Sequence, residues 1–292
     1  MKAARRDGQA LALLLLLAPV LVWLLGLIVI PQASLAYQSL QERSAVGGQH
    51  VASLAQYRSF FEEPQYWRSY LRTALMSLLA TACTLAIAFP VAWHVAKVAR
   101  GRLRLWMMVA LLVPFWASET VRSLGWMLLL RESGVLPHWL AAAGLVAEPP
   151  ELLYHDATIL TGLVYTSLLF MVVPLVGVFE TLDDALLEAS YDLGGGRWST
   201  LWHIVVPHAA PGIAAGCIVV FMLAVGNYLT PTLLGGNSAH WFTEVIYDQF
   251  IVRSNWEQGA AFGVLLLVLS SAVVWVALSL TGQRLGQVLR RA

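Results

Sequence analysis

The chain has 292 residues, of which 59% are hydrophobic and only 12% charged, and its formal net charge is +1. An average soluble domain has about 25% charged residues, so the composition excludes an ordinary soluble globular protein. A helix needs about 20 apolar residues to cross a hydrocarbon core about 30 Å thick. Runs of this kind predict an all-α integral membrane protein with six transmembrane helices, at about residues 11–30, 73–96, 105–130, 157–179, 209–234 and 258–283.

The first span, 11–30, follows three basic residues, as the hydrophobic segment of a signal peptide does. Its apolar run of about 20 residues is longer than the roughly 7–15 of a signal peptide. The stretch IPQASLAYQ that follows offers no clean A-x-A cleavage site. We therefore expect an uncleaved membrane helix.

The third span, 105–130, carries Glu119 and Arg122, three residues apart on one helix face. Ionisable groups inside a membrane are costly, so the two either line a substrate passage or pair with each other or with a neighbouring span. An aromatic ring beside a carboxylate suits an ammonium ion through cation–π attraction, although aromatic residues at membrane boundaries usually act as anchors. The other candidates for the passage wall, on the third and fifth spans, are Trp116, Trp126, Asn227 and Tyr228.

A polar, patterned loop, 183–207, lies between the fourth and fifth spans. Asp183 or Asp184 is a suitable N-cap, and apolar and small residues follow at helical spacing up to Leu193. Three glycines at 194–196 then end the helix, because glycine tolerates the left-handed conformation. A second helix from about Ser199 to before Pro207 completes two short amphipathic helices, which either contact a partner or rest in the lipid interface.

Small residues inside the spans predict close packing. Gly212 and Gly216 form a G-x-x-x-G at the start of the fifth span, a pattern typical of a helix-packing face, which we expect to meet a partner subunit. Cys83 and Cys217 fall within spans, without metal-ligand spacing, so we interpret them as packing residues.

Orientation follows from the basic residues. A cytoplasmic N-terminus places 11 of the 18 Lys and Arg residues inside, six outside, and Arg122 in the membrane. An excess of basic residues marks the cytoplasmic side. Both termini and the loop 183–207 are therefore expected in the cytoplasm.

Catalytic and nucleotide-binding motifs are absent from the sequence. There is no G-x-x-x-x-G-K-[ST], H-E-x-x-H or G-x-S-x-G, and no paired-cysteine metal site. We therefore expect no catalytic residue, metal or cofactor in this chain, and no nucleic-acid partner. Any ATP, with its Mg, would be used by a separate ATPase chain.

The stretch EASYDLGGGRWSTLWHIVVP, 188–207, resembles the EAA loop of binding-protein-dependent ABC importer permeases. Glycine stands six residues after glutamate and proline thirteen after glycine, as in that motif, and Ser190 replaces its usual alanine. In the family, the first helix of this loop is the coupling helix, which docks into a groove on the ATPase subunit. The resemblance assigns this role to Glu188, Ala189, Ser190, Asp192, Leu193, Gly194 and Pro207.

Four further stretches, from about residue 70 to 270, are similar to the spermidine/putrescine-type permeases: 114–126, 162–175, 211–236 and 255–261. Arg122 matches an arginine common in that family, whereas Glu119 is not part of its pattern. The resemblance implies a type I ABC importer permease fold in the bacterial cytoplasmic (inner) membrane. It also implies four kinds of partner: a second related permease, two ATPase subunits, an extracytoplasmic substrate-binding protein and membrane lipid.

The resemblance implies ATP-driven import of a polyamine or a similar small amine, with a small amino acid or an aminophosphonate as the alternative cargo. Two other classes of protein stay open on the residues themselves. Six spans with charge inside the membrane also suit an ATP-independent secondary transporter or channel, and a membrane scaffold would transport nothing. A secondary transporter or channel has no use for the glycine-hinged loop, and no internal repeat is visible.

Overall fold

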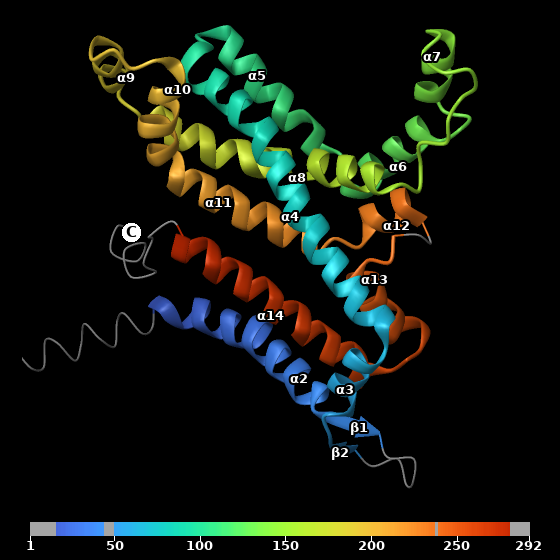
Figure 1. Cartoon of the computed structure of the whole chain (residues 1–292). Coiled ribbons are helices and arrows are strands. Elements are labelled where there is room, and N and C mark those ends of the chain that lie inside the picture. Colours follow the sequence, from blue (N-terminus) through green and yellow to red (C-terminus); the bar gives the residue numbers. More distant parts are fainter. Residues whose placement is uncertain (1–15, 44–49, 237–238, 281–292) are drawn as a thin grey trace, which may run out of the picture. The chain divides into compact units, whose positions relative to one another are not determined.

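The computed structural model describes residues 16–43, 50–236 and 239–280 (Figure 1). Its fold is helical apart from one short ribbon, which confirms the all-α class. Five helices in the described residues are long and apolar enough to cross a membrane: Leu16–Ser39, Pro64–Val98, Asp156–Glu180, Arg197–Val225 and Trp256–Ser279. They cover five of the six predicted spans with shifted ends. Residues 11–15 and 281–283 of the predicted first and last spans lie outside the described residues.

The chain divides into two compact units, and the first contains Met1–Trp67 and Ile246–Leu267. Its first described helix starts at Leu16 and continues through the π-helical turn Leu25–Val29 into α2, Ile30–Ser39. The antiparallel strands β1, Gln41–Arg43, and β2, His50–Ala52, lead to α3, Ala55–Glu62. The π-helical turn Asp248–Val252 precedes α14, Trp256–Leu280, which belongs to this unit as far as Leu267.

Aromatic rings form the core of the first unit. Phe262 of α14 packs edge-on against Phe60 of α3, at 6.0 Å between ring centroids, and against Tyr66, at 4.8 Å. The hydroxyl of Tyr57 donates to Ser39 Oγ over 2.8 Å and so joins α3 to the end of α2. This unit carries none of the predicted site residues.

The second unit, Arg68–Val245 with Val268–Ala292, holds all of them. Its elements are α4 from Arg68 onward (Pro64–Trp93), the π-helical turn His94–Val98, α5 (Arg102–Leu112), α6 (Glu119–Leu130), α7 (Val135–Ala142), α8 (Asp156–Glu180), α9 (Asp184–Asp192), α10 (Arg197–Thr200), α11 (Val206–Val225), α12 (Leu229–Gly235) and the start of α13 (Phe242–Tyr247).

The third predicted span, 105–130, is wrong as a single helix. The helix α5 ends at Leu112, the 3₁₀ turn Val113–Trp116 follows, and Ala117 is extended before α6 begins at Glu119. Pro114 cannot donate a backbone hydrogen bond, which favours the break. Ser118 caps the new helix by accepting a hydrogen bond from Val121 N over 3.3 Å.

The prediction for the loop and fifth span is also wrong in part. The helix that was expected to stop before Pro207 runs without interruption from Arg197 to Val225. A π-helical turn, Leu201–Val205, directly precedes α11, whose second residue is Pro207, and shifts the hydrogen-bonding register, so the proline's missing donor does not end the helix. The predicted span end at 234 is wrong as well, because α11 ends at Val225 and α12 is a separate short helix.

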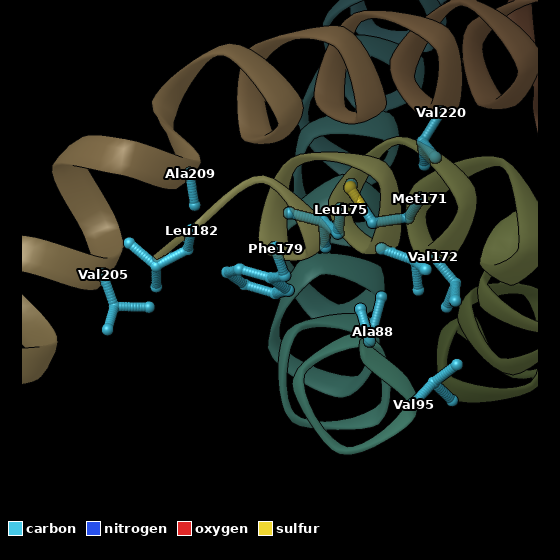
Figure 2. Packing of buried hydrophobic residues seen from close by; sticks show 12 residues of the cluster. Ala88, Val95, Met171, Val172, Leu175, Phe179, Leu182, Val205, Ala209 and Val220 are labelled. Carbon is cyan, nitrogen blue, oxygen red and sulfur yellow. The ribbon is translucent and has the colours of Figure 1, made fainter. Parts of the chain in front are cut away.

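The core of the second unit forms where α8 packs along α11 and α4. Figure 2 shows Leu175 and Phe179 of α8 between Ala88 of α4 and Ala209 of α11. Such packing removes apolar surface from contact with lipid and brings small residues together. The twelve buried residues of this cluster are Ala88, Ala92, Val95, Met171, Val172, Leu175, Val176, Phe179, Leu182, Val205, Ala209 and Val220.

The two glycines of the G-x-x-x-G pattern pack within the chain. A Cβ at Gly212 would lie 2.9 Å from the carbonyl oxygen of Pro174, and one at Gly216 would lie 2.5 Å from Met171 Sδ. Both contacts are with α8, so the expected partner-subunit face is wrong. The close approach of α8 and α11 explains the small residues, since any side chain would hold the two backbones apart.

Candidate functional site

A cavity of about 490 Å³ opens within the second unit at the points where its helices break. The start of α6, the middle of α8 and the turn between α11 and α12 form its walls. It therefore combines side chains from regions far apart in the sequence. The lining residues are Phe115, Glu119, Arg122, Thr166, Ser167, Phe170, Met222, Leu223, Gly226, Asn227, Tyr228 and Leu229.

Glu119, the first residue of α6, is tied to the turn that follows α11. Its Oε1 accepts a hydrogen bond from Asn227 Nδ2 over 2.6 Å and one from Thr230 Oγ1 over 3.3 Å. The Asn227 side chain in turn accepts from Thr230 N over 2.9 Å. The helix dipole favours a carboxylate at a helix N-terminus, so Glu119 stands at a suitable position beside the cavity.

Arg122 lies one turn further along α6, with its guanidinium 4.5 Å from the centroid of the Phe115 ring. Phe115 packs edge-on against Phe170 of α8, at 5.3 Å between centroids. The cation–π contact offsets part of the cost of placing this charge in an apolar surrounding. The Nε and Nη1 atoms of Arg122 are buried and have no hydrogen-bond partner among the described residues.

Glu119 and Arg122 form no ion pair with each other in the described part of the chain. The carboxylate faces the donors of the α11–α12 turn, and the guanidinium faces an aromatic ring. Each charge is thus held by its own neighbours. The cavity therefore offers both a carboxylate and a guanidinium to a polar ligand.

Four of the predicted passage residues line this cavity, namely Glu119, Arg122, Asn227 and Tyr228. Trp116 is 87% exposed and does not line it. Trp126 packs edge-on against Tyr165, at 5.5 Å between centroids, and is also outside the lining. Sequence reasoning missed Phe115, Phe170, Thr166 and Ser167, since uncharged residues inside a hydrophobic run carry no signal of their own.

The predicted coupling helix is present as α9, Asp184–Asp192. Asp183 caps it by accepting a hydrogen bond from Ala185 N over 3.0 Å. At the other end, Gly194 has φ +83°, a left-handed conformation that strains other residues. A Cβ at Gly195 would lie 2.6 Å from the carbonyl oxygen of Ser190, so two of the three glycines are required by the turn itself.

The residues to which the family resemblance assigns a coupling role differ in their exposure to solvent. Glu188, Ala189 and Asp192 are exposed, and Leu193 is 90% exposed, so an apolar side chain projects from the end of α9. The side chain of Ser190 instead contacts α10, with its Oγ 2.9 Å from Thr200 Oγ1. Pro207 lies within the helix Arg197–Val225 and outside α9.

No group of three or more metal-ligating side chains is found among the residues that the structure describes. The expected absence of a bound metal or cofactor stays a prediction.

Comparison with known proteins identifies the family. Residues 8–287 match the family "Binding-protein-dependent transport system inner membrane component". The chain belongs to this family. It is a multi-pass inner-membrane protein and the permease subunit of an ABC importer.

Several curated relatives are similar over most of the permease. The "Spermidine/putrescine transport system permease protein PotB" of Salmonella typhimurium (strain SL1344) is 33% identical over 77% of this chain and 79% of its own. Its namesake in Haemophilus influenzae is 30% identical over 87% of this chain and 88% of its own. The "Inner membrane ABC transporter permease protein YdcU" of Escherichia coli is 32% identical over 74% of this chain and 72% of its own.

Solved structures agree on the fold. A chain of a bacterial alginate ABC transporter, crystallised with an alginate-bound periplasmic protein, has a TM-score of 0.77 at 18% identity, with 97% of the permease and 98% of that chain covered. A second alginate transporter structure has a TM-score of 0.73 at 19% identity, with the same coverage. At this identity the likeness concerns the fold alone.

Proposed function

We propose that this permease imports a polyamine or a similar small amine. Two of the similar permeases, those of Salmonella typhimurium and Haemophilus influenzae, are named for spermidine and putrescine transport, which supports this class of cargo. The observation that carries the proposal is the carboxylate of Glu119 at the wall of a cavity inside the helix bundle. A desolvated ammonium needs such a counter-charge, and the ring of Tyr228 lines the same cavity.

The permease works in this proposal with a second related permease, two ATPase subunits and an extracytoplasmic binding protein. The exposed end of α9, with Glu188, Ala189 and Leu193, docks on the ATPase. ATP and Mg are bound there and not by this chain. Both termini and α9 lie in the cytoplasm, as the distribution of basic residues predicts.

A small zwitterion, such as an amino acid or an aminophosphonate, is the second candidate cargo. It is favoured by Arg122, whose Nε and Nη1 have no partner among the described residues. A carboxylate or phosphonate could satisfy these donors while the amine meets Glu119. A polyamine has no acceptor of that kind.

Uptake by the reconstituted complex tests the proposal. The two permeases and the ATPase are placed in vesicles with the binding protein outside, and uptake of putrescine, spermidine, amino acids and aminophosphonates is compared with and without internal ATP. ATP-dependent accumulation of a polyamine alone supports the first proposal. Accumulation of a zwitterion alone replaces it with the second, and uptake that continues without ATP contradicts both.

A further inference from the structure

Lys97 joins the end of one membrane helix to the turn between α8 and α9 and to the first residue of α9. It lies in the π-helical turn His94–Val98, which ends the helix that starts at Pro64. Its Nζ donates to the carbonyl oxygen of Leu182 over 2.5 Å and to Asp184 Oδ1 over 2.7 Å. Leu182 precedes α9 and Asp184 is its first residue, so a single ammonium group holds the α8–α9 turn.

The surroundings make this contact firm. The Lys97 side chain is only 12% exposed, whereas that of Asp184 is 71% exposed, so water is excluded from one partner of the ion pair. On the apolar side of the same junction, Val95, Phe179 and Leu182 are buried together in one core. A second ion pair, between Arg104 of α5 and Glu180 of α8, is 41% exposed on both sides, and such exposed pairs contribute little.

The other end of α9 is held by a different membrane helix. Ser190 bonds to Thr200 through their hydroxyl groups over 2.9 Å, and Gly195 N donates to Ser190 O over 2.8 Å. Thr200 belongs to the continuous helix Arg197–Val225. The helix α9 is therefore fixed at its first turn to the helix 64–98 and at its last turn to the helix 197–225.

We propose that Lys97 is a positioning residue that transmits displacement of α9 to the membrane helix 64–98. The inference rests on the proposed docking of α9 on an ATPase. Energetic coupling between distant sites is carried by packed and hydrogen-bonded contacts of rigid elements. The Ser190–Thr200 contact provides a separate route to the helix 197–225. Loss of Lys97 therefore removes the polar contact between α9 and the helix 64–98 and leaves the contact with the helix 197–225 in place.

The test uses Lys97→Met, which keeps the length of the stem and removes its donors, in the complete transporter. Cys83→Ala and Cys217→Ala provide a background without native cysteines. A fluorophore is attached at Leu79→Cys on α4 or at Val219→Cys on α11, both at exposed positions. The signal is the change in fluorescence when a non-hydrolysable ATP analogue is added.

We expect Lys97→Met to reduce the nucleotide-dependent signal at residue 79 by about 2- to 30-fold, the usual range for residues along a coupling route. The signal at residue 219 and the ATPase rate should match those of the unchanged chain. Lys97→Arg keeps donors at this position and should retain most of the signal at residue 79. The matched control is Arg72→Met, which breaks the 2.5 Å ion pair between Arg72 of α4 and Asp156 of α8 at the opposite ends of these helices.

An unchanged signal at residue 79 in Lys97→Met overturns the inference. A loss of signal in Lys97→Met that is equal at residues 79 and 219 also overturns it. So does a loss at residue 79 in Arg72→Met that equals the loss in Lys97→Met. If Lys97→Met fails to assemble, Asp184→Asn decides, because this side chain is 71% exposed and its charge alone is removed. A selective loss at residue 79 then supports the inference and no loss overturns it. Failure of the docking proposal has a different signature, since Glu188→Arg would then leave both signals intact.

Discussion

Glu119 receives its hydrogen bonds from Asn227 and Thr230, across the break between α11 and α12, and none from Arg122. Helix spacing alone suggested that Glu119 and Arg122 pair with each other, whereas in the structure each contacts different neighbours. The Glu119 carboxylate connects α6 to the turn between α11 and α12 by hydrogen bonds, and the Arg122 guanidinium lies over the Phe115 ring. A substitution at either position therefore disturbs a different set of neighbours.

We predict that Glu119→Gln weakens uptake of a cationic cargo by about tenfold or more, because hydrogen bonds to charged groups contribute about 1.5–3 kcal/mol. The amide oxygen can still accept from Asn227 and Thr230, so assembly and basal ATP hydrolysis should stay normal. Concentration dependence of uptake by the reconstituted complex is the measurement.

Arg122→Gln distinguishes the cargo classes. For a zwitterionic or anionic cargo it should reduce uptake more than Glu119→Gln does, since it removes the guanidinium that would bind the acid group. If Glu119→Gln with Arg122→Gln restores assembly and transport that either single change impairs, the two charges act as a structural pair and the proposed role of Glu119 toward cargo is wrong.

A matched pair of glycines tests the α8–α11 packing. Gly212→Ala places a methyl group 2.9 Å from the Pro174 carbonyl oxygen, and overpacking of this kind costs about 1–3 kcal/mol. Gly177 of α8 has no atom within 4 Å of the corresponding position. We expect Gly212→Ala to lower the unfolding temperature of the purified permease and Gly177→Ala to leave it unchanged or raise it, because alanine is the better helix former. Equal effects would contradict the close approach.

At the scale of elements, the breaks between helices decide where the site lies. The helix α6 starts again at Glu119 because Pro114 and the extended Ala117 interrupt the run and Ser118 caps the new helix. The helix α11 ends at Val225, and the Asn227 side chain accepts a hydrogen bond from Thr230 N at the start of α12. The cavity lies at both breaks, where backbone and side-chain polar groups can face a passage inside the membrane.

The glycines after α9 give the element-scale prediction. Gly194→Leu forces a bulky residue into φ +83° and should abolish uptake, although the complex still assembles, because the end of α9 changes direction. Gly196 has φ −74° and no atom within 4 Å of a Cβ, so Gly196→Leu is the control that keeps uptake. Uptake that persists in Gly194→Leu would remove the coupling role of this turn.

At the scale of the whole molecule, the expected orientation places α9 with the ATPase and the segment between α6 and α7 on the opposite side. Cysteine labelling of intact cells tests this in the background without Cys83 and Cys217. Gly196→Cys should react only with a membrane-permeant reagent, and Ser133→Cys also with an impermeant one, since both positions are exposed. Reaction of residue 196 with the impermeant reagent would reverse the orientation and exclude the ATPase contact.

Hydrophobic run length and motif spacing by themselves determined the class of protein, five of the long helices and the glycine-terminated α9. They did so because a bilayer demands about 20 apolar residues per helix and because glycine permits the left-handed turn. The spacing of Glu188, Gly194 and Pro207 also pointed to the family that the comparisons show.

Tertiary structure alone decided which residues meet. Hydropathy does not register a local break, so the 105–130 run was predicted as one helix. Pro207 was predicted as a helix end because the sequence does not reveal the π-helical turn that lets the helix continue through it. The spacing of Gly212 and Gly216 predicted a close helix contact but did not identify the contacting helix, which is α8 of the same chain. Glu119 meets Asn227, and Lys97 meets Asp184, across more than eighty residues of sequence. Contacts over such separations depend on how the helices pack, and no local pattern encodes them.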